Sequence, residues 1–255
     1  MNLLFEYIKY HWKAKKRHGT HSPFIYELVD KCLQVAVNEQ DKKEIKNLIS
    51  QLKNNHSTIQ IADFGAGSKK LNNERKISSI LKISSSKGKY ARFFYQLAAY
   101  YQPQQVLEFG TSLGIGTLHF AKGNPSAQIT TVEACPQTAQ VAQQNFEQLQ
   151  LKNINLVNTT FQDFLDNTTL LPYDVIFIDG HHDGVALSNY VDMLFPYMKD
   201  DTFVILDDIR WSNFMFESWQ KLTQDNRFHV SIDLMRMGIL LKRPQQRKEH
   251  FTIRL

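Results

Sequence analysis

Residues 105–116 read QVLEFGTSLGIG, an apolar run that ends in an acid and passes through Phe-Gly to two further glycines. Such a run is typical of a buried strand, and closely spaced glycines let the chain turn tightly into a helix beneath a bound nucleotide. Residues 60–69, QIADFGAGSK, begin in the same way. The sequence beyond each stretch decides which of the two is expected to hold a ligand.

The two stretches differ in the segments that come after their glycines. Gly116 is followed by TLHFA, which can cover a sheet. The next apolar run, ITTVE, ends at Glu133, an acid placed to accept ribose hydroxyls. Gly67 is followed by the polar segment SKKLNNERKISS, and no strand that ends in an acid comes next. We therefore expect the ligand at the turn before Gly116, and we interpret residues 63–68 as a loop that either roofs the site or is only a structural turn.

Short apolar runs alternate with segments long enough to be helices throughout the second half of the chain. The runs are VLEF, ITTVE, INLVN, DVIFID, TFVILDD, HVSIDLM and MGILLKR. The first five are separated by crossover segments such as residues 136–150 and 185–198, a pattern typical of a parallel sheet covered on both faces. The last two are too close for a crossover. They predict an antiparallel hairpin at one edge of the sheet, with Gly238 near its turn.

The chain has 255 residues, of which 42% are hydrophobic, and this favours one main core. We expect an α/β core over residues 105–255, preceded by a helical and irregular extension over residues 1–104, in which YARFFYQLAAYY packs against the sheet. The start of the chain has no long apolar run, so we expect neither a secretory signal nor a membrane span and interpret the protein as cytoplasmic. Cys32 and Cys135 lack disulfide or zinc-ligand spacing and are expected to be free thiols.

The formal net charge of +5 is concentrated at the two ends, in residues 1–17 and 242–254. Basic terminal segments can bind nucleic acid or anionic lipid, but they are more often the solvated face of an amphipathic helix. We favour the second interpretation.

The ordered set VLEFGTSLGIGT, TVEA, FQDF, YDVIFIDGHH and VILDD resembles the class I S-adenosylmethionine-dependent methyltransferases, and the resemblance covers residues 106–243. That family has a Rossmann-like sheet of seven mostly parallel strands whose last strand is antiparallel, in agreement with the hairpin predicted above. A dehydrogenase shares the glycine motif, but it would be expected to continue with further parallel strand–helix units.

The resemblance implies a set of residues that bind S-adenosylmethionine. Backbone around Gly110, Thr111 and Ser112 would approach the methionine part of the cofactor. Glu133 would hold the ribose hydroxyls, and Asp163 would lie near the adenine amine. The full set of implied cofactor-binding residues is Glu108, Gly110, Thr111, Ser112, Gly114, Glu133, Ala134, Asp163 and Asp179.

The residues after the fourth predicted strand indicate the kind of acceptor. Enzymes of this family that methylate nucleic-acid bases usually carry an Asn/Asp-Pro-Pro-aromatic motif there, whereas this chain has Asp179-Gly-His-His, which disfavours nucleic acid. DVIFIDGHH followed by VILDD is similar to the catechol-type and sugar-modifying O-methyltransferases. That similarity implies a divalent cation, Mg²⁺ or Mn²⁺, held by Asp179, Asp207 and Asp208, because carboxylates at adjacent strand ends suit a hard cation. Alternatively, Asp207 and Asp208 only cap a turn before Ile209.

Histidines form the remaining candidate residues. His182 lies three residues after Asp179, where the catechol-type enzymes have a lysine, and a histidine can act as a general base near neutral pH. We assign the catalytic roles to His182 and Asp179. His18 and His21, within RHGTHSPF, are assigned to a lid over the substrate pocket, and His181 is left unassigned.

These patterns together predict an S-adenosylmethionine-dependent methyltransferase that acts on a small molecule, by O-methylation of a hydroxyl with help from a divalent cation. A metal-independent N- or O-methyltransferase is one alternative, which insensitivity to a chelator would support. A non-catalytic module that keeps the fold and binds RNA or a protein partner through its basic ends is another. A homodimer remains open.

Overall fold

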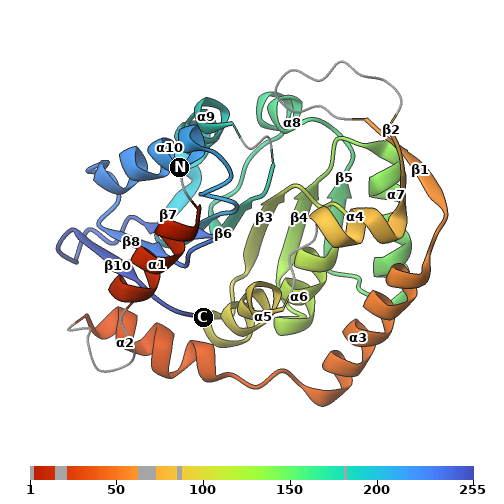
Figure 1. The fold of residues 1–255 in the computed structure, drawn as a ribbon, viewed down its shortest axis with the longest axis horizontal. Helices are drawn as coiled ribbons and strands as arrows, with labels where there is room; N and C mark the ends of the chain where they lie inside the picture. Colours follow the sequence, from red (N-terminus) through yellow and green to blue (C-terminus); the bar gives the residue numbers. More distant parts are fainter. Residues whose placement is uncertain (1–2, 15–21, 63–72, 85–87, 181–182) are drawn as a thin grey trace.

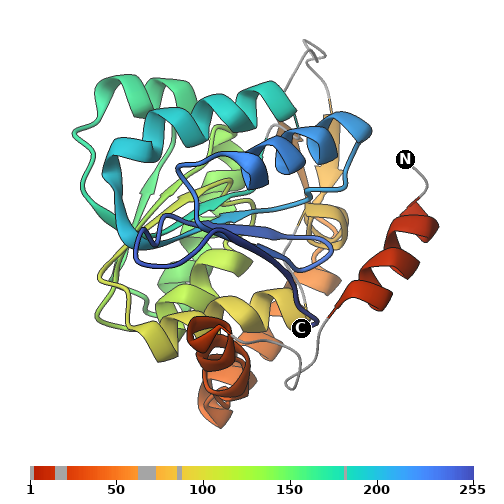
Figure 2. The same cartoon turned by 90° about the vertical axis from the view of Figure 1, so that its left-hand side faces the viewer.

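The computed structural model describes residues 3–14, 22–62, 73–84, 88–180 and 183–255. In this part of the chain a central sheet has helices on both faces (Figures 1 and 2). Its strand order is β10-β8-β9-β7-β6-β3-β4-β5. The strands are β3 (Gln105–Phe109), β4 (Gln128–Val132), β5 (Ile154–Val157), β6 (Tyr173–Ile178), β7 (Met198–Leu206), β8 (Val230–Asp233), β9 (Gly238–Leu241) and β10 (Glu249–Thr252).

The seven predicted strands are confirmed as β3 to β9, and their pairing gives the predicted fold class. Neighbouring strands are parallel except for β9, which is antiparallel to both β7 and β8. The predicted hairpin of β8 and β9 is therefore present, but β9 lies between β7 and β8. The edge beyond the hairpin is β10, which pairs in parallel with β8 and was not predicted.

Five helices of the described chain follow strands of the central sheet. They are α6 (Ile115–Gly123), α7 (Pro136–Gln148), α8 (Phe161–Asn167), α9 (Gly184–Leu194) and α10 (Asn213–Gln224), with a 3₁₀ turn at Phe195–Tyr197. Two of them, α7 and α9, lie close to the predicted crossover segments 136–150 and 185–198. Pro136 occupies the first turn of α7, where its missing N–H costs nothing. Side chains of α8, α9 and α10 pack with Leu107, Ile176 and Val204 on one face of the sheet.

In the part of the chain that the structure describes, four helices precede α5 (Lys89–Tyr101). These are α1 (Leu3–Lys13), α2 (Pro23–Asp30), α3 (Glu39–Asn54) and α4 (Ile77–Ser84), with a 3₁₀ turn at Cys32–Gln34. Two short strands, β1 (Thr58–Ile61) and β2 (Asn73–Lys76), pair antiparallel as a separate small sheet that was not predicted.

Packing is continuous across the boundary predicted between residues 104 and 105. Phe24, Ile25 and Leu28 of α2 lie in one buried cluster with α5 and with strands β3, β6 and β7. The predicted contact of YARFFYQLAAYY with the sheet is confirmed, because Phe94 and Leu97 of α5 belong to the same cluster. The extension thus contributes directly to the core that carries the site, and the division into two domains stays a prediction.

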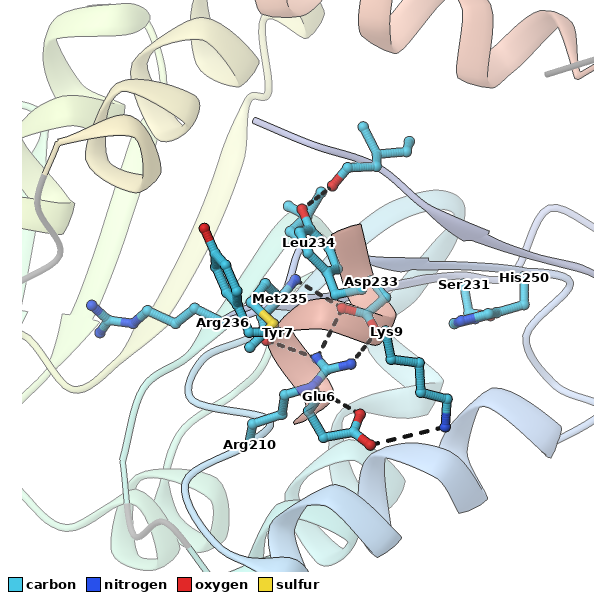
Figure 3. Close-up of polar contacts among 12 residues, drawn as sticks. Glu6, Tyr7, Lys9, Arg210, Ser231, Asp233, Leu234, Met235, Arg236 and His250 are labelled. Carbon is cyan, nitrogen blue, oxygen red and sulfur yellow. Dashed lines mark hydrogen bonds and ion pairs between the residues drawn. The ribbon is translucent and has the colours of Figure 1, made fainter. Parts of the chain in front are cut away.

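Helix α1 is fastened to the far end of the chain. Tyr10 donates a hydrogen bond from its hydroxyl to the carbonyl of Ile253, at 2.5 Å. Glu6 pairs with Arg210, which also forms two hydrogen bonds with Asp233, at 2.9 and 2.6 Å (Figure 3). This cluster ties the first helix to the last strands of the sheet.

Two further expectations concern the cysteines and the membrane. Cys32 and Cys135 are buried free thiols, as predicted. Among the described residues, we find no helix with the length and apolar character needed to cross a bilayer.

Candidate active site

The turn between β3 and α6 brings three strand ends together. Gly110 has a φ of 98°, and its N–H donates to the carbonyl of Val132 at the end of β4. The N–H of Asp179 donates to the carbonyl of Phe109, which joins the end of β6 to β3. A Cβ added at Gly110 would lie 1.8 Å from the carbonyl oxygen of Asp179. The glycine is therefore required both by its positive φ and by the close approach of the β6 backbone.

Glu133, the first residue after β4, faces this turn. Its carboxylate accepts hydrogen bonds from the N–H groups of Ser112 and Cys135, both at 2.9 Å. Burial raises the pKa of Glu133 above its usual value, against the opposing effect of these donors. The hydroxyl of Ser112 is buried and forms no hydrogen bond with any residue that the structure describes. An acid and an unbonded hydroxyl at a glycine turn suit a polar ligand such as an adenosyl cofactor.

Glu108 lies inside the fold, with 1% of its surface exposed. The hydroxyls of Thr117 and Thr131 both donate to its carboxylate, and Thr131 also shares a hydrogen bond with Thr111, at 2.6 Å. Burial raises the pKa of Glu108 to about 7, although the two hydroxyl donors act in the opposite direction. These contacts hold the turn in place, and direct contact of Glu108 with a cofactor stays a prediction.

The three predicted metal-binding aspartates do lie together at the carboxyl edge of the sheet. Asp179, Asp207 and Asp208 each offer an oxygen atom, and these atoms lie within 4.8 Å of one another. Burial, followed by the charges of Asp207 and Asp208, raises the pKa of Asp179 well above its usual value. Burial and Asp208 raise the pKa of Asp207 to about 6. We call these three residues the acid cluster.

The alternative turn-capping role of Asp207 and Asp208 is also present. The carboxylate of Asp207 accepts the N–H of Asp208 at 2.8 Å, and the carbonyl of Asp208 accepts the N–H of Trp211. Asp208 itself has a φ of 49°, a conformation that aspartate tolerates better than most residues. The two interpretations of these aspartates are thus compatible, because backbone groups and a shared ligand can use different lone pairs.

Arg236, which no sequence pattern singles out, contacts the acid cluster. Its Nε donates to Asp207 Oδ1 at 2.8 Å, and a terminal nitrogen donates to Asp207 Oδ2 at 2.5 Å. The same Nε lies 3.1 Å from Asp208 Oδ1. In Figure 3 the Arg236 side chain points away from the neighbouring ion pair of Arg210 and Asp233. The acid cluster has the oxygen ligands that a hard cation requires. The guanidinium of Arg236, however, already forms ion pairs with two of its three carboxylates.

The structure gives less support to the remaining predicted site residues. Asp163 lies in the first turn of α8, where its N–H donates to the Thr160 hydroxyl and its carboxylate accepts from it, at 3.1 and 2.6 Å. This exposed pair caps the helix, and its contact with adenine stays a prediction. Ala134 is partly exposed beside Glu133. The predicted histidines at positions 18, 21 and 182, the unassigned His181 and the loop 63–68 lie outside the described residues.

A cavity of about 510 Å³ adjoins the start of α6 and was not anticipated from the sequence. Its wall is mainly apolar, with Ile49, Leu81 and Ile115 among the lining residues, and it includes Lys53. His119 also lines the cavity, and burial lowers the pKa of His119 to about 4. The cavity therefore suits an uncharged or anionic organic group in preference to a cation.

Comparison with known proteins agrees with this geometry. Residues 107–209, which run from β3 to just beyond the acid cluster, match the family described as "Methyltransferase domain". The catechol O-methyltransferase of Mycobacterium tuberculosis is 27% identical over 129 residues, which is 50% of this chain and 56% of that protein. The enzyme of the same name from Niastella koreensis is 26% identical over 136 residues, covering 51% of this chain and 58% of the relative. The chain thus spans little more than half the length of these curated relatives.

Solved structures share the fold at low sequence identity. An O-methyltransferase from Bacillus cereus in complex with SAH superposes with a TM-score of 0.57 at 16% identity, covering 84% of this chain and 95% of that one. An SAH-bound methyltransferase from Podospora anserina gives a TM-score of 0.56 at 15% identity, covering 82% and 97%. At these identities the structures support the fold alone.

Proposed function

We propose that this chain, which carries a methyltransferase domain of the S-adenosylmethionine-dependent class, transfers a methyl group to a hydroxyl of a small molecule. One observation carries the proposal. The backbone of Asp179 in the acid cluster packs directly on Gly110 of the glycine turn. A methyl donor held at the turn and an acceptor held at the acid cluster would therefore be neighbours, as methyl transfer requires.

We assign binding of the cofactor to the glycine turn and to the end of β4. Glu133 is proposed to accept the ribose hydroxyls, and Ser112, whose buried hydroxyl has no described partner, to bond the amino-acid part. Glu108 acts through the threonines that it holds, since Thr111 lies within the turn. When bound, the cofactor supplies an electrophilic methyl group on a sulfonium.

Activation of the acceptor falls to the acid cluster and to His182. We propose that Asp179 orients the acceptor hydroxyl and that His182 takes its proton, because an imidazole is a suitable base near neutral pH. The residues that would hold Mg²⁺ or Mn²⁺ are Asp179, Asp207 and Asp208. Such a cation would lower the pKa of a coordinated hydroxyl.

A metal-independent transfer is the second candidate, and the contacts of Arg236 favour it. The guanidinium already neutralises part of the charge of the acid cluster through Asp207 and Asp208. On this alternative, His182 and Asp179 alone would position and deprotonate the acceptor.

Release of S-adenosylhomocysteine from S-adenosylmethionine in the presence of catechols, hydroxylated aromatic acids and sugars tests the proposal. We expect turnover with at least one hydroxyl compound and a loss of about 100-fold or more in Asp179→Asn. Asp166→Asn, in an exposed acid of α8, is the matched control and should keep full turnover. Unchanged turnover in Asp179→Asn would contradict the role of the acid cluster. A chelator added to the parent separates the two candidates, because only metal-assisted transfer should lose activity.

A further inference from the structure

Arg236 lies in the turn between β8 and β9, and its side chain reaches across to the end of β7. It uses both oxygens of Asp207, and the same Nε lies near Asp208. Two-pronged contacts between arginine and carboxylate are the strongest ion pairs that side chains form. We propose that Arg236 is the resident counter-cation of the acid cluster and that a divalent ion binds these carboxylates only by displacing its guanidinium.

The hydrogen bonds of Asp207 place the guanidinium against both of its carboxylate oxygens. Its Oδ1 accepts from Asp208 N–H and from Arg236 Nε, and its Oδ2 accepts from a terminal nitrogen of Arg236. Asp207 is only 2% exposed, so its carboxylate cannot turn outward to find another partner. A hard cation also needs carboxylate lone pairs at close range. A cation at that range would lie beside the positive guanidinium, and the mutual repulsion favours binding of the ion after the guanidinium has left.

Electrostatics explains why a resident cation is needed. Three carboxylates offer oxygens within 4.8 Å of one another at a partly buried strand edge, and unpaired they would repel strongly. Arg236 lies within ion-pair distance of Asp207 and Asp208 and has an attractive interaction with Asp179. A divalent ion would supply more positive charge at the same place. Either the guanidinium or the ion therefore offsets the negative charge of the acid cluster.

The turn allows the arginine to leave without unfolding. The backbone of Arg236 is held independently of its side chain: its N–H donates to the carbonyl of Leu234, and its carbonyl accepts the N–H of Ile209. The side chain is 29% exposed and lies on the ring of Tyr90, with the guanidinium 5.9 Å from the ring centre. Rotation of the side chain toward solvent would therefore open the acid cluster while the hairpin keeps its place.

Lys89 provides a matched control for charge. Its ammonium lies 5.2 Å from the centre of the same Tyr90 ring, yet it forms no described ion pair with the acid cluster. Lys89→Met and Arg236→Met each remove one positive charge from the surroundings of Tyr90, and only the second removes a contact with the carboxylates.

The test is a calorimetric titration of Mn²⁺ into the parent, Arg236→Met and Lys89→Met, each saturated with S-adenosylhomocysteine. We expect Arg236→Met to bind Mn²⁺ about tenfold or more tightly than the parent, because a competing charge-assisted contact is gone, while Lys89→Met stays within about twofold. An equal gain in both variants would mean a general charge effect and would overturn the proposal. So would equal affinity in Arg236→Met and the parent, or no Mn²⁺ binding in either.

Arg236→Lys decides the question if Arg236→Met does not fold, as thermal unfolding would reveal. Lysine keeps the charge but loses the two-pronged contact, so the variant should gain about threefold in Mn²⁺ affinity over the parent. Unchanged affinity would again overturn the proposal. The inference rests on the proposed function only in taking the acid cluster as the place where a divalent ion would bind. Metal affinity is measured without turnover, so absence of methyl transfer would count against the function and leave this result standing.

Discussion

Glu133 combines two tasks at the end of β4, since its carboxylate closes the glycine turn and is proposed to hold ribose. Glu133→Ala should weaken binding of S-adenosylhomocysteine by about 1.5 to 3 kcal/mol, because the ligand loses a charged acceptor. Calorimetry measures this loss. Glu147→Ala, in an exposed acid of α7, should leave affinity unchanged, and Glu133→Gln, which keeps one acceptor oxygen, should fall between the two. Equal affinity in all three variants would remove Glu133 from the cofactor site.

Glu108 makes stability depend on pH in a direction opposite to that of most carboxylates. Its pKa of about 7 in the fold exceeds the usual value of 4.5, so between these limits the folded chain keeps a proton that the unfolded chain releases. Stability should therefore fall as pH rises from about 4.5 to 7, by roughly 3 kcal/mol for this residue. Glu108→Gln, which resembles the protonated acid, should lose this contribution. Denaturation at pH 5 and pH 8 compares them, and parallel pH profiles would contradict the prediction.

At the residue scale, the sequence predicted acids better than it predicted their partners. Glu133, Asp179, Asp207 and Asp208 each follow a recognisable strand, and parallel strands bring their carboxyl ends to one edge. Arg236 follows a different rule, because it reaches the acid cluster from a turn whose position depends on β9 pairing between β7 and β8. No local pattern in the sequence encodes that reach.

At the scale of elements, the β3–α6 turn depends on the end of β6. Gly110→Ala should cost about 3 kcal/mol or more in stability, because the new Cβ would meet the fixed carbonyl of Asp179 at a positive φ. Gly180→Ala, at the same edge, would meet the ring of Phe161 at 2.6 Å, a side chain in place of fixed backbone and without a positive φ at residue 180, and should cost less. Urea denaturation measures both. A smaller loss in Gly110→Ala than in Gly180→Ala would show that the turn adapts more easily than its geometry implies.

The strands that the sequence predicted and those it missed differ in composition. Runs such as VLEF and DVIFID are buried on both faces of a covered sheet, so they are apolar throughout and easily recognised. The strands β2 and β10, with sequences NERK and EHFT, lie in a small separate sheet and at the sheet edge. Polar residues are stable there because one side faces solvent. These strands form because a partner is present, which periodicity alone does not show.

At the scale of the whole molecule, α1 joins the two ends of the described chain. Tyr10→Phe should lower stability by about 1 to 2 kcal/mol, because the buried hydroxyl no longer satisfies the carbonyl of Ile253. Tyr7→Phe is the matched control on the same helix, since Tyr7 is 49% exposed, and it should change stability by less than about 0.5 kcal/mol. Chemical denaturation compares the two. Equal losses would mean that the Tyr10 contact contributes nothing specific.

The contact between Tyr10 and Ile253 also fixes an order of events during synthesis. The two residues are 243 positions apart, so the ribosome makes α1 long before it makes the carbonyl that accepts this hydrogen bond. Until Ile253 has been added, the hydroxyl of Tyr10, whose side chain is 3% exposed in the folded chain, lacks this acceptor. The hydrogen bond that fastens α1 to the rest of the fold can therefore form only after β10 has been synthesised.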